Sequence, residues 1–257
     1  MNKLKDKILR GEKVLGTHIQ LNGSMTTEII GNLGFDYLWI DTEHSSLSLE
    51  QVEQHLLAAR AAGVSAIVRV PNNNPVRLKP ILEMGPDGVI VPMVNSYEEA
   101  LRAVQSCLYP PHGTRGFGPR RASLYGMTPI QDYLEHAADD TMRLIQIEHI
   151  DAVHNLKLIT TISEIDAYII GPCDLSASIG KLGAADDAET CALYDEIIAT
   201  VHAAGKPVGV SCGLCDMAEI ARWRSRGIDM ISLASETDFI ITGARRMLED
   251  MRRVMLE

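Results

Sequence analysis

The chain has 257 residues, of which 46% are hydrophobic and 23% charged, and its formal net charge is -10. These proportions are typical of a globular protein and exclude collagen-like, coiled-coil and disordered classes. No segment approaches the roughly 18 consecutive apolar residues of a membrane span, and the charged N-terminus lacks the apolar core of a signal peptide. An acidic chain disfavours nucleic acid and membrane lipid as partners, because phosphate binding needs a basic field.

The cysteine content favours a protein with reduced thiols in the cytoplasm. Five cysteines are an odd number, in a chain long enough to bury its own core. Cys212 and Cys215 have C-x-x-C spacing, but a structural zinc site needs a second pair, and Cys107, Cys173 and Cys191 do not form one. We therefore interpret this spacing as a coincidence.

Short apolar or β-branched runs recur along the chain, and a helical pattern follows each of them. The predicted strands are residues 15–19, 37–40, 66–70, 88–91, 143–147, 167–170, 208–210 and 230–233. The clearest helical patterns between them are residues 49–62, 96–106, 194–204 and 216–226. Several of these helices end in glycine just before the next strand, which is the expected connection in α/β proteins.

Eight such βα units in one chain of this length predict a (β/α)8 TIM barrel that occupies residues 1–257 as a single domain. The intervals between the ends of consecutive strands are longer from residue 91 to 147 and from 170 to 210, which predicts insertions after the fourth and sixth strands. An open doubly wound sheet is the alternative, but it would need a glycine-rich phosphate-binding turn after its first strand, and residues 21–25 lack one. The amphipathic stretch 235–257 predicts a last helix that is longer than a barrel requires.

Polar residues close four of the predicted strands, at the end of a barrel where catalytic groups lie. They are Asp41, Glu43 and His44 after the second strand, Arg69 in the third, Gln146 and Glu148 at the end of the fifth, and Asp174 in the turn Gly171, Pro172, Cys173, Asp174 after the sixth. So many polar groups on one rim predict an active site.

Glu148 and Asp174 close adjacent strands, so their carboxylates can converge. Two carboxylates, with water and a chelating substrate, commonly hold Mg²⁺ or Mn²⁺; a solvated carboxylate pair is the alternative. The alternation of a strand puts Gln146 on the same face as Glu148. The backbone N–H groups of Cys173 and Asp174 could bind a substrate carboxylate.

His44 and Arg69 are the candidate catalytic side chains. His44 lies three residues after Asp41, and such a carboxylate could orient the ring of a general base. Other histidines in helical patterns, such as His55, are expected at the surface. Arg69 lies among Ile and Val, and it needs an anionic partner because burying it unpaired would cost several kcal/mol. We expect it to stabilise a developing oxyanion.

Six segments, taken together, resemble the class II, metal-dependent pyruvate aldolases. They are residues 35–44, 68–71, 89–94, 109–116, 146–148 and 171–176, and the likeness runs in order from about residue 12 to 235. The resemblance is to 4-hydroxy-2-oxoheptanedioate and 2-dehydro-3-deoxyglucarate aldolases, in the citrate lyase β-subunit superfamily. It implies that Glu148 and Asp174 hold Mg²⁺, Mn²⁺ or Co²⁺ and that Gln146 contacts substrate. It also implies that the backbone at Cys173 and Asp174, in the substrate-binding turn that starts at Gly171 and Pro172, binds the pyruvate carboxylate.

The same resemblance implies that Arg69 stabilises the enolate oxygen and that His44 is the base, supported by Asp41. In the family a carboxylate from a neighbouring subunit raises the basicity of this histidine. Glu83 occupies that position, where the family usually has Asp, so the longer side chain leaves its role open. The resemblance also implies a homohexamer, a trimer of dimers, with the last helix exchanged between barrels.

The implied reaction is reversible aldol cleavage of a 4-hydroxy-2-oxo acid to pyruvate and an aldehyde through a metal-bound pyruvate enolate. The substrate would be a 2-keto-3-deoxy sugar acid or 4-hydroxy-2-oxoheptanedioate, from aromatic or sugar-acid catabolism. Consistently, the predicted strand ends carry no lysine for a Schiff base; Lys79, Lys157 and Lys206 fall in loops or helices.

The sequence leaves three alternatives to the aldolase function. A lyase acting on malyl- or citramalyl-CoA would share the barrel, but it needs a larger mouth with basic residues. Oxaloacetate decarboxylation is chemically close because it yields the same enolate. A non-catalytic binding barrel is disfavoured, because Glu148, Asp174, Arg69 and His44 are all retained.

Overall fold

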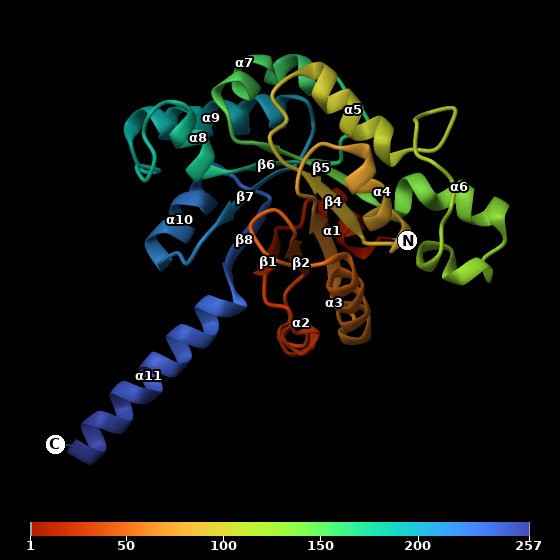
Figure 1. Cartoon of the computed structure of the whole chain (residues 1–257). Coiled ribbons are helices and arrows are strands. Elements are labelled where there is room, and N and C mark those ends of the chain that lie inside the picture. The colour runs from red at the N-terminus through yellow and green to blue at the C-terminus, as the bar shows by residue number, and fades with distance from the viewer. Residues whose placement is uncertain (1, 257) are drawn as a thin grey trace.

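Eight parallel strands close into a barrel, each paired with the next in chain order and the last with the first (Figure 1). The structure, a computed structural model, describes residues 2–256. The strands are β1 (Val14–Ile19), β2 (Tyr37–Asp41), β3 (Ser65–Arg69), β4 (Gly88–Val91), β5 (Met142–Ile147), β6 (Ala167–Ile170), β7 (Val208–Cys212) and β8 (Met230–Ser235). The predicted TIM barrel is confirmed.

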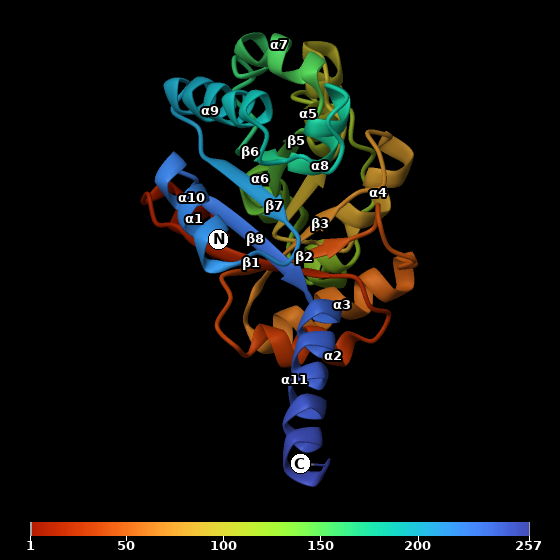
Figure 2. The ribbon, with the colours of Figure 1, turned by 90° about the vertical axis from the view of Figure 1, so that its left-hand side faces the viewer.

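Helices surround the barrel (Figures 1 and 2). They are α1 (Lys3–Leu9), α2 (Ser24–Gly31), α3 (Leu49–Ala62), α4 (Pro75–Glu83), α5 (Tyr97–Cys107), the 3₁₀ helix η1 (Arg121–Gly126), α6 (Ile130–Asp140), α7 (Ile150–Ile159), α8 (Pro172–Ser178), α9 (Ala188–Ala203), α10 (Met217–Arg226) and α11 (Glu236–Leu256). The two predicted insertions are confirmed: α5, η1 and α6 lie between β4 and β5, and α8 and α9 lie between β6 and β7.

The two faces of each strand pack into different clusters, as the alternation of side chains in a strand requires. In β2, Trp39 joins the cluster inside the barrel, while Leu38 and Ile40 face the surrounding helices. Leu4 and Ile8 of α1 belong to the inner cluster, so α1 covers the N-terminal end of the barrel. Each fully buried aliphatic side chain of this kind stabilises the fold by roughly 1.5–3 kcal/mol.

Helix α3 shows how the local sequence sets an element's limits. Ser48 caps its first turn, and Gln51 reciprocates in a capping box. The helix ends at Gly63, whose φ of 75° lies in the left-handed region that favours glycine. The prediction for His55 is wrong: the side chain is buried between α2 and α3, with Nδ1 2.6 Å from the Thr27 hydroxyl.

Helix α11 projects away from the barrel over most of its 21 residues (Figures 1 and 2). The predicted long last helix is therefore confirmed, and its exchange between barrels stays a prediction. Its exposed apolar side chains are Phe239, Ile240, Ile241, Met247, Leu248, Met251, Val254, Met255 and Leu256. Within residues 2–256, no helix combines the length and the apolar character that crossing a bilayer would require.

Candidate active site

A cavity of about 270 Å³ lies at the carboxyl ends of the strands, where a TIM barrel places its chemistry. The rim residues that the sequence predicts and that line it are His44, Arg69, Gln146, Glu148, Gly171, Pro172, Cys173 and Asp174. The remaining wall is formed by His18, Gln20, Ser211, Cys212, Gly213, Ala234, Ser235 and Asp238. The structure thus brings residues from the ends of β2, β3, β5 and β6 together, and adds groups from β1, β7 and β8.

Glu148 lines this cavity and is held by two hydrogen bonds. Its side chain accepts hydrogen bonds from the Met93 N–H on Oε1 (2.7 Å) and from the Gln146 amide on Oε2 (2.8 Å). The prediction that Gln146 and Glu148 share one strand face is confirmed. Met93 donates its N–H from a left-handed backbone with φ of 52°, a strained conformation for methionine.

Burial raises the pKa of Glu148 to about 7, and the negative charges of Glu43 and Asp174 add to the shift. The side chain of Glu148 is only 2% exposed, whereas Asp174 is exposed at the start of α8. Gly171 leaves room for the carboxylate, because a Cβ at that position would lie 2.6 Å from Glu148 Oε2. A buried carboxylate that lies near other negative charges and lines an open cavity fits a divalent cation.

Arg69 forms a two-pronged ion pair with Asp41 on the neighbouring strand. Its Nε and Nη2 donate to the two carboxylate oxygens at 2.9 and 2.7 Å. Its Nη1 lies 3.0 Å from Glu43 Oε2 and 3.4 Å from Gln146 Oε1. Burial opposes ionisation of Asp41, but the hydrogen bonds and charge of Arg69 outweigh it and hold its pKa below the ordinary value. The anionic partner that the sequence requires for Arg69 is therefore present within the chain.

The carboxylate beside the His44 ring is Glu43, not Asp41 as the sequence suggests. Asp41 accepts from the backbone N–H groups of Glu43 (3.0 Å) and His44 (3.4 Å), and its oxygens are otherwise occupied by Arg69 and Gln20. The carboxylate near the ring is Glu43, whose Oε2 lies 3.8 Å from His44 Nε2. The His44 side chain is 61% exposed, which leaves it free to meet a substrate or a neighbouring subunit.

Glu83 does not reach the cavity of its own chain. It ends α4 and pairs with Arg115, whose Nη2 lies 3.2 Å from Glu83 Oε1. Its second carboxylate oxygen is buried and has no hydrogen-bond partner within the described part of the chain. Its action on the site of a neighbouring subunit stays a prediction.

His18 is a site residue that the sequence reasoning missed. Its Nδ1–H donates to the Ala234 carbonyl (2.7 Å), and its Nε2 accepts from the Ser211 hydroxyl (2.9 Å). Burial lowers the pKa of His18, so the ring is neutral at pH 7. His18 lies near the carboxyl end of β1, and this position in the sequence could have identified it as a site residue.

Residues 15–243 match the family described as HpcH/HpaI aldolase/citrate lyase. The chain belongs to this family. The hydroxypyruvate/pyruvate aldolase of Rhizorhabdus wittichii is 33% identical over 98% of this chain and 99% of that protein. The 4-hydroxy-2-oxo-heptane-1,7-dioate aldolase of Salmonella dublin is 33% identical over 96% of this chain and 93% of that protein.

The fold comparison agrees. A crystal structure of an HpcH/HpaI aldolase/citrate lyase family protein from Burkholderia cenocepacia J2315 has a TM-score of 0.93 and 28% identity, covering 98% of this chain and 100% of that one. The predicted resemblance is confirmed, and the protein is a lyase of the aldolase type. Dependence on a divalent metal is general in this family, in accord with the setting of Glu148.

Proposed function

We propose that this aldolase reversibly cleaves a 4-hydroxy-2-oxo acid to pyruvate and an aldehyde, using Mg²⁺, Mn²⁺ or Co²⁺ held by Glu148 and Asp174. The observation that carries the proposal is the placement of Glu148, Asp174 and Arg69 around one cavity. The names of the relatives from R. wittichii and S. dublin support this substrate class. Glu148 and Asp174 would hold the cation, and when bound it would supply positive charge for the carboxylate and keto oxygens of the 2-oxo acid.

The protein's own groups orient the substrate. The first turn of α8, which begins directly after Gly171, presents the backbone N–H groups of Cys173 and Asp174 to the substrate carboxylate. Arg69 stabilises the negative charge that develops on the keto oxygen as the enolate forms. Its guanidinium is preorganised for this task, because Asp41 fixes two of its donors and Trp39 lies beneath it, 5.2 Å from ring centroid to Cζ.

His44 takes the proton of the C4 hydroxyl in the cleavage direction. The C4–O bond becomes a carbonyl, the C3–C4 bond breaks, and its electron pair forms the enolate of pyruvate. Protonation of the enolate at C3 then releases pyruvate. Glu43 and, from a neighbouring subunit, Glu83 are the carboxylates that we assign to raise the basicity of His44.

We infer a cytoplasmic homohexamer, a trimer of dimers, in which α11 packs on a neighbouring barrel. The row of exposed apolar side chains on α11 supports an intersubunit contact, because water disfavours such a surface. The partners of the active site are small molecules, a 2-oxo acid and an aldehyde.

The cavity favours this reaction over the alternatives. Arg69 is its one arginine or lysine among the residues that the structure describes, so the site offers little to the phosphates of a CoA thioester. Within the same limits, the cavity lining includes no lysine that could form a Schiff base. Oxaloacetate decarboxylation remains a side reaction through the same enolate.

A substrate panel tests the proposal. The Mn²⁺-loaded enzyme is incubated with 4-hydroxy-2-oxo acids of different chain length, with malyl-CoA and with oxaloacetate, and pyruvate and the aldehyde or thioester products are quantified. We expect the highest kcat/KM with a 4-hydroxy-2-oxo acid. A higher value with malyl-CoA, or a pyruvate adduct trapped by borohydride, would contradict the proposal.

A further inference from the structure

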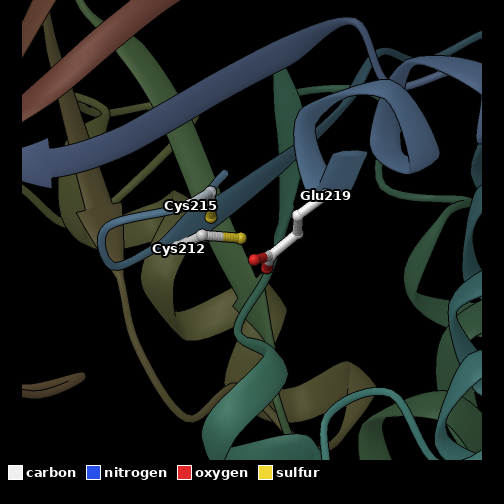
Figure 3. A group of neighbouring side chains, drawn as sticks. All are labelled: Cys212, Cys215 and Glu219. Atoms are coloured by element: carbon white, nitrogen blue, oxygen red, sulfur yellow. The ribbon is translucent and has the colours of Figure 1, made fainter. Parts of the chain in front are cut away.

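Three potential metal ligands converge beside the active-site cavity, on the loop between β7 and α10 (Figure 3). Cys212 is the last residue of β7. Cys215 lies just before Asp216, the N-cap of α10, and Glu219 lies in the first turn of that helix. Their ligand atoms, two sulfurs and a carboxylate oxygen, all lie within 4.8 Å of one another. Among residues 2–256 this is the one group of three or more His, Cys, Asp or Glu side chains so gathered.

The local structure explains how the helix brings a carboxylate to the two thiols. Asp216 caps α10 by accepting from the Glu219 N–H at 2.8 Å, which fixes the first turn over the loop. Glu219 therefore lies in the first turn of α10, with its carboxylate beside the two thiols of the preceding loop. Figure 3 shows the carboxylate of Glu219 turned toward the sulfur of Cys212, with Cys215 beside it.

We propose that Cys212, Cys215 and Glu219 form a second cation site, for a thiophilic divalent metal such as Zn²⁺. Thiolates select zinc over magnesium, which prefers oxygen ligands alone. Three protein ligands leave one position of a tetrahedral zinc site for water or another group. The sequence interpretation of the C-x-x-C spacing counted only cysteines and did not consider the carboxylate that α10 brings near them.

The proposed site shares a wall with the aldolase site. Cys212 lines the same cavity as Glu148 and Asp174. The two sites nevertheless differ in chemistry: Glu148 and Asp174 offer oxygen atoms alone, whereas Cys212 and Cys215 offer sulfur. The two sites should therefore be loaded independently, and the inference does not depend on the proposed substrate.

Cadmium binding is the direct test, because thiolate-to-cadmium charge transfer gives an ultraviolet band that carboxylate ligands do not. The protein is stripped with a chelator, kept reduced, and titrated with Cd²⁺ in the presence of excess Mg²⁺. We expect one thiolate-bound Cd²⁺ per chain and its competitive displacement by Zn²⁺. The Cys212→Ser and Cys215→Ser variants should each lose the band, and Glu219→Gln should weaken binding while the band itself remains.

Two control variants separate this site from the rest of the protein. Cys191→Ser removes a half-buried thiol of α9 that is outside the cluster, and it should keep full binding. Glu148→Gln removes a ligand of the proposed aldolase metal, and it should keep the cadmium band. Circular dichroism checks that each variant is folded.

Three results would overturn the inference. The first is the absence of a thiolate band in the reduced wild-type protein. The second is a band that survives in a folded Cys212→Ser, Cys215→Ser double variant. The third is loss of the band in Glu148→Gln, which would mean that thiolate-bound cadmium also needs Glu148 and that the two sites are not separate.

Discussion

The guanidinium of Arg69 and the carboxylate of Asp41 form two parallel hydrogen bonds, at 2.9 and 2.7 Å, across the adjacent strands β3 and β2. Asp41 is fully buried and Arg69 is 7% exposed, so this pair is shielded from solvent. A bidentate pair of this kind fixes the plane of the guanidinium and leaves Nη1 directed at Gln146 and Glu43. Asp41 therefore orients Arg69 rather than the ring of His44.

Replacing Arg69 should depress every reaction that passes through the enolate. Arg69→Ala should lower both aldol cleavage and oxaloacetate decarboxylation by ~10²–10³-fold, the usual effect of a lost oxyanion donor. Arg69→Lys should recover only part of this loss, because a point charge cannot reproduce the planar fork. Steady-state kinetics on both substrates check the prediction, and loss of cleavage alone would contradict it.

The same substitution should also reduce stability, since Asp41 would be left buried without its partner. We expect Arg69→Ala to lower the free energy of unfolding by roughly 3–5 kcal/mol. The double variant Arg69→Ala, Asp41→Asn should recover part of that loss without recovering activity. Urea unfolding of the two variants, followed by circular dichroism, measures the difference. An unchanged unfolding midpoint in Arg69→Ala would show that the pair contributes nothing to the fold.

His44 acts in this scheme on a proton that oxaloacetate lacks. His44→Ala should slow aldol cleavage by ~10²–10⁴-fold, which is the usual contribution of a general base. Oxaloacetate decarboxylation should stay mostly intact, because its substrate has no C4 hydroxyl to deprotonate. Equal losses in the two reactions would assign His44 to substrate or metal positioning instead.

Gly171 should be needed for metal binding, although it contributes no side chain. A Cβ there would lie 2.6 Å from Glu148 Oε2, so Gly171→Ala should displace the carboxylate and weaken Mn²⁺ binding. Gly23→Ala is the matched control, because a Cβ at Gly23 meets nothing within 4 Å. Isothermal titration with Mn²⁺ compares the two variants. Equal affinities would show that the space at Gly171 is not required.

The pKa of Glu148 predicts how the stability of the metal-free protein depends on pH. The folded-state pKa is about 7, against an ordinary value of 4.5, so the folded state holds this proton more tightly than the unfolded state. The resulting stabilisation is present below pH 4.5 and is lost as pH rises through 7. Its size is about 3 kcal/mol, at roughly 1.4 kcal/mol for each pKa unit.

Glu148→Gln should remove this component, because the amide does not titrate. The measurement is the difference in unfolding free energy between the wild type and the variant, from pH 4.5 to 8 after chelation. Relative to the variant, the wild type should lose stability across this range, and Mn²⁺ should restore it. A difference that is flat with pH would mean that Glu148 titrates normally.

The fold could be predicted from the sequence because its information is local and repeated. The strands β4 and β6 agree with the prediction at both ends, and so does α3. The other strand boundaries differ by one or two residues, because hydrophobic periodicity marks the centre of a strand more clearly than its ends. The start of α9 was missed by six residues, because its first turn, from Ala188, is polar and lacks the apolar period that marked Tyr194 onward.

Much of the site could also be predicted, because polar residues at strand ends converge in any barrel. The pairing of side chains within the site could not be predicted. Asp41 is close to His44 in the sequence, but in the folded chain its carboxylate contacts Arg69. The spacing in the sequence favoured His44 as the partner of Asp41. The strand register instead places Asp41 beside Arg69. His18 was missed for a similar reason, since β1 meets β7 and β8 only when the barrel closes.

Pyruvate release from a 4-hydroxy-2-oxo acid, followed before and after chelation, tests the central claim most directly. EDTA should abolish cleavage by the wild type, and Mg²⁺, Mn²⁺ or Co²⁺ should restore it. Glu148→Gln and Asp174→Asn should stay folded and inactive at every metal concentration that restores the wild type. Full pyruvate release in EDTA, from protein shown by elemental analysis to be free of metal, would contradict the account.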